Sequence, residues 1–119
     1  MSQSYDSIKI RPVLDGRWHR MTADGHGFYE RIAFSIANAG RIPIDVSGLM
    51  MRIVFPGKPE EYPLEFPQGT STLMPEVPLI FDLDLLPQEM TPAIEAVIIL
   101  LKKNNGKELA RADIQFITQ

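Results

Sequence analysis

A chain of 119 residues has the usual length of one domain, and its 45% hydrophobic and 23% charged residues are typical of a protein that folds around an apolar core. The absence of cysteine excludes disulfides and thiolate metal sites. A net charge of -3 gives nucleic acid no electrostatic reason to bind, so we expect no nucleic-acid partner. Without linkers or repeats, residues 1–119 are expected to form a single domain.

The amino-terminal segment shows neither the basic patch nor the apolar run of a signal peptide. The longest apolar run, residues 96–101, is far shorter than a membrane-spanning helix requires. These features predict a cytoplasmic protein with no membrane span, or an exported one if a leader has been removed.

Apolar and polar residues alternate with period two in several stretches, which is typical of β-strands with one buried face. The alternation begins in residues 8–14 and returns in residues 28–36, where Glu30 is the only charged residue on the apolar side. Residues 79–85 and 110–116 follow the same pattern, with Ile80, Asp82 and Asp84 on the polar side of the former. Four stretches with one period predict an all-β fold.

Two regions are ambiguous in phase or type. Residues 49–55 are apolar at odd positions and residues 42–46 at even positions, so a bulge or break at Ser47 and Gly48 must separate them. In residues 91–103, Thr91 and Pro92 resemble a helix start, whereas the β-branched run that follows favours a strand leading into an Asn-Gly turn. We expect a strand, buried on both faces.

Turn signals and prolines delimit these segments. Pairs such as Asp15-Gly16, Pro56-Gly57 and Asn105-Gly106 fit tight turns. Eight of the ten prolines fall in residues 56–92, which predicts edge strands and irregular loops there, because proline cannot donate to a sheet ladder. About seven to eight short strands with such turns describe a β-sandwich.

Residues 32–44, with Asn38, Gly40 and Pro43 between two alternating strands, resemble the corner between strands B and C of bacterial immunoglobulin-like modules of the cell-adhesion-related type (CARDB-type domains). Residues 86–89 are similar to the loop before strand F of such modules, and residues 97–116 to their terminal hairpin. The resemblance implies an immunoglobulin-like Greek-key β-sandwich. In the turn, Asn38 is expected to bond nearby backbone and Gly40 to adopt a positive φ.

Nothing in the sequence predicts a catalytic centre, a cofactor or a metal site. The chain has two histidines, His19 and His26, and no nucleophile or phosphate-binding motif around its Ser, Thr or Gly residues. Asp24 with His26, and Asp82 with Asp84 and Glu76, have metal-ligating side chains at close spacing. A solvated turn and a solvated strand face explain both groups better.

Binding residues are sought among aromatic and arginine side chains, which dominate protein contacts. Trp18, the sole tryptophan, stands between arginines in a segment expected to form a hairpin, and Tyr62 and Phe66 lie in the proline-rich segment. In both places a purely structural role is the alternative to a binding one. The candidate binding residues are therefore Arg17, Trp18, Arg20, Tyr62 and Phe66.

The sequence thus predicts a non-enzymatic protein–protein interaction module or small assembly subunit, which binds another protein or itself through a sheet edge. The alternative is a β-sandwich that binds a carbohydrate or another small ligand, which would place Trp18 or Tyr62 exposed beside a carboxylate.

Overall fold

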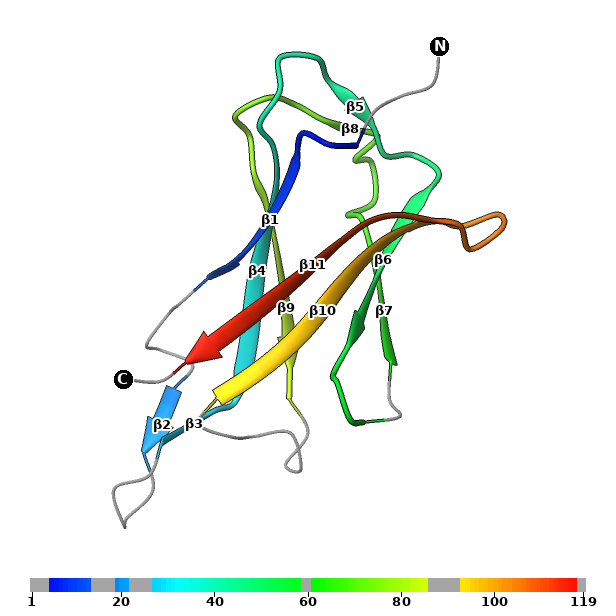
Figure 1. The fold of residues 1–119 in the computed structure, drawn as a ribbon. Coiled ribbons are helices and arrows are strands. Elements are labelled where there is room, and N and C mark those ends of the chain that lie inside the picture. The colour runs from blue at the N-terminus through cyan, green and yellow to red at the C-terminus, as the bar shows by residue number, and fades with distance from the viewer. Residues whose placement is uncertain (1–4, 14–18, 22–26, 59–60, 86–92, 118–119) are drawn as a thin grey trace.

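The computed structural model describes residues 5–13, 19–21, 27–58, 61–85 and 93–117, and in these residues it contains strands and no helix. Two antiparallel sheets face each other (Figure 1). One sheet has the order β1-β4-β9, with β1 at Ile8–Val13, β4 at Arg31–Asn38 and β9 at Leu79–Asp84. The other has the order β11-β10-β6-β7, with β6 at Leu49–Val54, β7 at Glu61–Glu65, β10 at Ala93–Lys102 and β11 at Glu108–Ile117. The all-β prediction is confirmed.

The core lies between the two sheets and is filled by the apolar side of each alternating strand. On β4, Ile32, Phe34 and Ile36 are all buried, and the ring of Phe34 stacks on that of Phe81 in β9 with 5.5 Å between centroids. The second sheet contributes alternate residues of its own strands: Met51, Ile53, Ile94, Ala96, Ile98, Leu100, Ile114 and Phe116. A buried aliphatic or aromatic side chain contributes about 1.5–3 kcal/mol, so this alternation stabilises the sandwich.

β10 resolves the ambiguity between helix and strand. All ten residues of Ala93–Lys102 are in one strand, which pairs with β11 on one side and β6 on the other. Its β-branched run fits a pleated sheet, and Val97 and Ile99 remain half-buried on the outer face. The predicted strand is confirmed at the centre of the larger sheet, but the expected burial on both faces is wrong, because Glu95 is exposed and Val97 and Ile99 are only half-buried.

Two small two-stranded sheets complete the fold. β2 (His19–Met21) pairs with β3 (Gly27–Tyr29), and β5 (Ile44–Asp45) pairs with β8 (Thr72–Leu73). The expected strand over 28–36 is divided by a bend at Glu30, so it forms β3 and β4. A turn at residues 46–48 separates β5 from β6, which reconciles the two phases as expected. With these short pairs, the described residues contain eleven strands, of which seven form the two larger sheets.

The side chain of Asn38 forms hydrogen bonds that join the end of β4 to three neighbouring segments. Its side chain is 1% exposed, and its Nδ2 donates to the carbonyls of Ile42 at 2.8 Å and Leu73 at 3.1 Å. Its Oδ1 accepts from the backbone N–H of Gly40 at 2.9 Å and from the hydroxyl of Ser7 at 3.2 Å. All four bonds of the amide are therefore made, and the predicted bonding of Asn38 to nearby backbone is confirmed.

The expectation for Gly40 was wrong. The glycines with positive φ among the described residues are Gly57, Gly69 and Gly106, in three of the predicted turn regions, whereas Gly40 is not in the left-handed region. Gly40 is instead tightly surrounded: a Cβ there would lie 3.1 Å from the Cβ of Ser7 and 3.2 Å from the Oδ1 of Asn38, so these neighbours would have to shift.

The described residues contain no helix that is both long and apolar enough to cross a membrane.

Candidate functional site

The predicted binding residues around Trp18 are only partly described. Arg17 and Trp18 lie outside the described residues, as do Asp24 and His26. Arg20 is placed on β2, opposite Phe28 of β3.

Tyr62 and Phe66 both turn a ring towards the core. Tyr62, on β7, meets Phe55 edge-on at 5.8 Å between ring centroids, and Phe66, directly after β7, meets Phe81 of β9 edge-on at 5.6 Å. Both side chains are half-buried. Phe66 thereby fills the space between β7 and β9, where the two sheets face each other at one side of the sandwich.

The carboxylates of Asp82 and Asp84 bind an arginine. The Nε of Arg31 donates to Asp84 at 2.7 Å, and its Nη1 donates to Asp82 at 3.4 Å. The hydrogen bond to Asp84, followed by the charges of both carboxylates, raises the pKa of Arg31 above its usual value. Among the described residues, no group of three or more His, Cys, Asp or Glu side chains gathers in a geometry for a metal ion.

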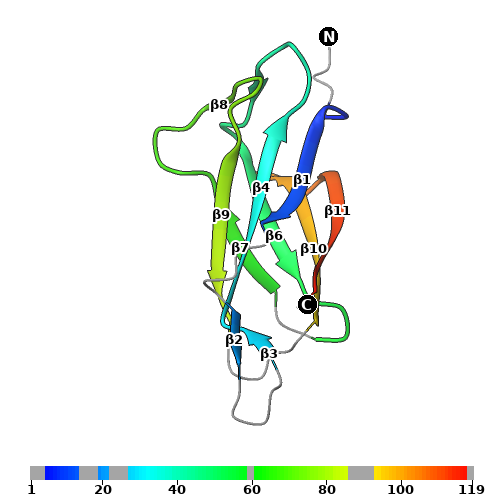
Figure 2. The ribbon, with the colours of Figure 1, turned by 90° about the vertical axis from the view of Figure 1, so that its left-hand side faces the viewer.

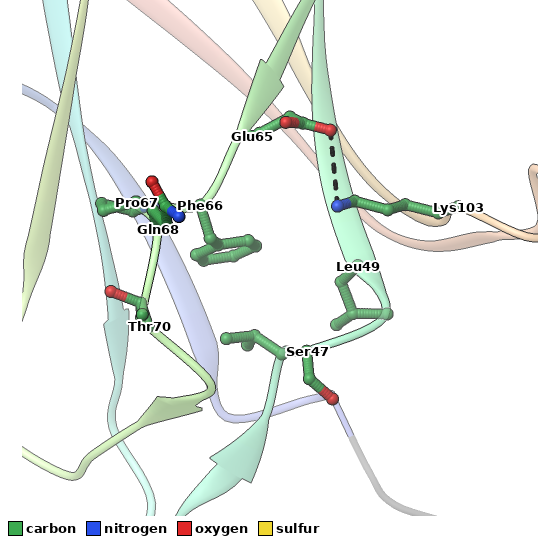
Figure 3. Close-up of a pocket in the computed structure, with 10 residues that line it drawn as sticks. Ser47, Leu49, Glu65, Phe66, Pro67, Gln68, Thr70 and Lys103 are labelled. Atoms are coloured by element: carbon green, nitrogen blue, oxygen red, sulfur yellow. Dashed lines mark ion pairs between the residues drawn. The ribbon is translucent and has the colours of Figure 1, made fainter.

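A pocket of about 380 Å³ opens where the end of β7 faces the turn between β5 and β6 (Figure 3). The ring of Phe66 lies opposite Leu49 in this pocket, and the carboxylate of Glu65 pairs with Lys103 across its rim at 3.4 Å. Ser47, Gln68 and Thr70 supply polar side chains to the wall. An aromatic ring beside a carboxylate and several hydroxyl or amide groups is a lining that suits a small polar ligand.

A second hollow, of about 450 Å³, adjoins the first and shares Ser47, Leu49 and Lys103 with it. Asp45 lies here, and its Oδ1 accepts hydrogen bonds from the backbone N–H of Ser47 at 2.9 Å and from its hydroxyl at 2.7 Å. These bonds, the hydroxyl first, hold the pKa of Asp45 below its usual value because they stabilise the charged carboxylate.

Four exposed apolar side chains lie on segments next to Asn38 or on the strand β9 that follows them. Ile42 is 78% exposed, Met74 48%, Val77 55% and Ile80 63%. The carbonyl of Ile42 itself accepts a hydrogen bond from Asn38. Pro75, which lies between Met74 and Val77, forms a parallel bridge with Asn38. We call Ile42, Met74, Val77 and Ile80 the apolar end patch.

Sequence reasoning foresaw only part of this patch. The alternation of residues 79–85 predicts that Ile80 lies on the polar side, and its exposure confirms this prediction. The prediction that Ile42 belongs to the apolar positions of residues 42–46 is wrong, because β5 begins only after Pro43. The signal for Met74 and Val77 is their place beside Pro75 and Pro78, where no strand period exists to bury them.

The turn that displays Met74 and Val77 holds an unfavourable backbone conformation. Glu76 has a φ of 64°, in the left-handed region that side-chain-bearing residues avoid. The N–H of Val77 donates to the carbonyl of Met74 at 3.3 Å and that of Glu76 to the carbonyl of Asn38 at 3.4 Å, so the surrounding contacts fix this turn. Strain of this kind persists where the structure around it over-determines the conformation, and it recurs at binding sites.

No family model matches the sequence, and no curated protein matches it either. A solved structure described as the X-ray structure of Northeast Structural Genomics Consortium target SoR45 is similar to this chain with a TM-score of 0.53 and 12% sequence identity. The similarity covers 98% of this chain and 90% of that chain. At this identity the likeness shows a shared fold and nothing about activity.

Proposed function

We propose that the protein is a protein–protein interaction module or small assembly subunit that binds through the edge of its sandwich next to the apolar end patch. The observation that carries the proposal is the exposure of Ile42, Met74 and Val77 on segments that Asn38 joins, and of Ile80 on the strand that follows. Single exposed apolar residues need no explanation, but a group of them on adjoining segments marks a contact surface. The strained turn at Glu76, which presents two of the four side chains, supports the same reading.

We include in the proposal that the fold is the immunoglobulin-like Greek-key sandwich of the cell-adhesion-related modules. Such a fold supports this role. Lettering the seven strands of the larger sheets A to G in chain order places A, B and E in one sheet and C, D, F and G in the other. Immunoglobulin constant-type domains keep the same partition except that D joins A, B and E. The turn at Asn38, Gly40 and Pro43 lies between strands B and C of this lettering.

The test is affinity capture followed by reconstitution. The immobilised protein is incubated with lysate of its native source, and an enriched protein is then purified and its Kd measured against three forms of the domain. Replacing Met74 and Val77 together by threonine should raise Kd at least tenfold. The matched control Val97→Thr, half-buried on the outer face of the other sheet, should leave it unchanged. Absence of any enriched protein, together with a monomer in sedimentation at high concentration, would overturn the proposal.

A second candidate function is binding of a carbohydrate or another small polar ligand in the pocket of Phe66. Its supporting observation is the ring of Phe66 in a pocket that Glu65, Lys103, Gln68 and Thr70 also line. A library of sugars and small acids screened by thermal shift tests it, since a ligand at a hundred times its Kd stabilises by about 2.7 kcal/mol. Binding here should be lost in Phe66→Leu.

A further inference from the structure

We infer that the free edge of β9 accepts an extended segment of another protein that carries basic residues opposite Asp82 and Asp84 and an apolar residue opposite Ile80. This inference rests on the proposed function and names its edge and the chemistry of its partner. Figure 2 shows β9, β4 and β1 side by side in this order, with β9 at the border of the sheet.

The hydrogen-bond pattern shows which groups β9 presents. The N–H of Leu85 donates to the carbonyl of Glu30 at 2.9 Å, in register with the pair Arg31 and Asp84. Antiparallel residues alternate between bonding the neighbouring strand and pointing away from it. The residues of β9 that bond β4 are therefore Leu79, Phe81 and Leu83, and those whose N–H and C=O point to the free edge are Ile80, Asp82 and Asp84. In the part of the chain that the structure describes, no strand pairs with this edge.

β1, the border strand on the other side of the same sheet, is less open to pairing with an added strand. The N–H of Ala39 donates to the carbonyl of Ser7 at 2.8 Å, so alternation places Ile8, Ile10 and Pro12 of β1 at the free edge. Pro12 has no N–H, and the N–H of Ile8 already donates to the carbonyl of Tyr5 at 3.1 Å. β1 also lies in contact with β11 (Figure 2).

The border strands of the larger sheet, β7 and β11, are also less suited to pair with an added strand. β7 carries Pro63 at its centre, the residue that removes a donor from a border strand. β11 lies against β1, and its pairing with β10 shifts register at Leu100 and Leu101. β9 contains no proline, and its register with β4 runs without a shift from Arg31 to Ile36. It is therefore the border strand best suited to accept another strand.

Side chains along the edge define the partner. Ile80 is exposed on the outer face, and Val77 and Met74 extend the apolar surface past the start of the strand. Asp82 and Asp84 follow on the same face and are exposed, and both bind Arg31 alone among the ion pairs described. The two carboxylates share one guanidinium, so this part of the edge keeps an excess of negative charge. A strand with lysine or arginine at these positions complements it, because cross-strand pairs of opposite charge are favourable.

Charge disfavours a second copy of this chain as the occupant. An antiparallel pair of two β9 strands that uses all three edge residues must be centred on Asp82. That register places Asp82 opposite Asp82 of the second copy, and like charges directly opposite destabilise a sheet. The inner face of an added strand would meet Phe66 and Leu83, both half-buried, so alternate residues of the partner should be apolar.

The experiment compares two acetylated and amidated peptides with the whole 119-residue chain. One has the sequence Thr-Lys-Val-Lys-Val-Ile-Thr and the other Thr-Glu-Val-Glu-Val-Ile-Thr. In antiparallel register the first places its lysines opposite Asp84 and Asp82 and its isoleucine opposite Ile80. Titration to millimolar peptide is followed by amide NMR shifts, with hydrogen exchange at Ile80, Asp82 and Asp84 as the local readout.

The basic peptide should bind at least tenfold more tightly than the acidic one and slow amide exchange at Ile80 and Asp82. Replacing Asp82 and Asp84 by asparagine should abolish this preference, whereas the control Asp113→Asn, an exposed carboxylate on β11, should leave it unchanged. Ile80→Pro removes the edge donor and should abolish binding. If that variant does not fold, Ile80→Lys tests the same position by repelling the basic peptide.

Two outcomes separate this inference from the proposed function. If neither peptide shifts the amides of β9, and a captured partner binds Ile80→Lys with unchanged Kd but still requires Met74 and Val77, the edge inference is overturned and the interaction function stands. If no peptide binds and no partner is captured, both are overturned.

Discussion

Replacing the buried Asn38 at the end of β4 by alanine should destabilise the fold strongly. The change deletes four hydrogen bonds, of which the one to the carbonyl of Leu73 is buried and those to Ile42, Gly40 and Ser7 are partly buried. Leaving the buried carbonyl of Leu73 without a donor costs about 2 kcal/mol. Loss of each of the other three hydrogen bonds costs about 0.5 kcal/mol, because the partner group can bond water instead. The expected loss in free energy of unfolding is therefore about 3–4 kcal/mol.

Urea unfolding followed by far-ultraviolet circular dichroism measures this loss at equilibrium, with an unchanged m value as the sign that the unfolded state is the same. The matched control is Asn105→Ala. Asn105 also accepts a backbone N–H, that of Lys107 at 2.9 Å, but in an exposed turn. That control should cost less than about 1 kcal/mol.

A second variant, Asn38→Asp, separates hydrogen bonding from volume. The introduced carboxylate would face the carbonyls of Ile42 and Leu73, to which the amide donated, so at pH 7 it should destabilise more than alanine does. Its folded pKa would be raised, so the deficit should shrink as the pH falls through that value and the protonated carboxyl can donate. Equal losses for the variants at positions 38 and 105, or a loss under about 1 kcal/mol for Asn38→Ala, would refute the reasoning.

Three further changes have defined outcomes. Gly40→Ala should lower the free energy of unfolding in urea by about 1–3 kcal/mol because its Cβ would crowd Ser7 and Asn38. Gly48→Ala, with no atom within 4 Å of its Cβ, should lower it by less than about 1 kcal/mol. Equal losses would contradict the close approach at Gly40. Glu76→Gly should stabilise the fold by roughly 0.5–1 kcal/mol in thermal unfolding because glycine relieves the positive φ, and a lower melting temperature would show that no strain is held there. Ser47→Ala should raise the pKa of Asp45 in an NMR titration because it removes the hydroxyl that stabilises the carboxylate, and an unmoved pKa would contradict this assignment. Because the pKa of Asp45 is lowered in the folded state, its contribution to stability is present above the usual carboxylate range and is lost as the pH falls through the lowered value, so a stability deficit of Ser47→Ala should vanish in strong acid.

The sequence predicted the strands well where alternation was long, because the buried face of a strand leaves a regular period. β10 could be predicted despite a helix-like start, since its β-branched residues fit a sheet and its end runs into an Asn-Gly turn. The division at Glu30 and the exposure of Ile42 could not be predicted. Both depend on where tertiary contacts end a strand, and an apolar residue in a loop has the same composition as one in a strand.

The candidate site was less predictable than the fold. The proline-rich segment pointed to Tyr62 and Phe66, but their ring partners Phe55 and Phe81 are set by packing between distant segments. Whether β9 is a border strand depends on pairings such as Arg31 with Asp84, which join positions 53 residues apart. A single sequence contains no local signal for such pairings, so the edge became visible only in the folded arrangement.

The central position of β10 bears on how the protein is made. It begins at residue 93 of 119, yet it separates β6 from β11 in the larger sheet. During synthesis the ribosome therefore releases β6 and β7 long before the strand that completes their sheet, with buried residues such as Met51 and Ile53 still open to water. The larger sheet therefore cannot close before β10 is made, and the apolar face of the β6–β7 hairpin stays exposed to aggregation in that interval.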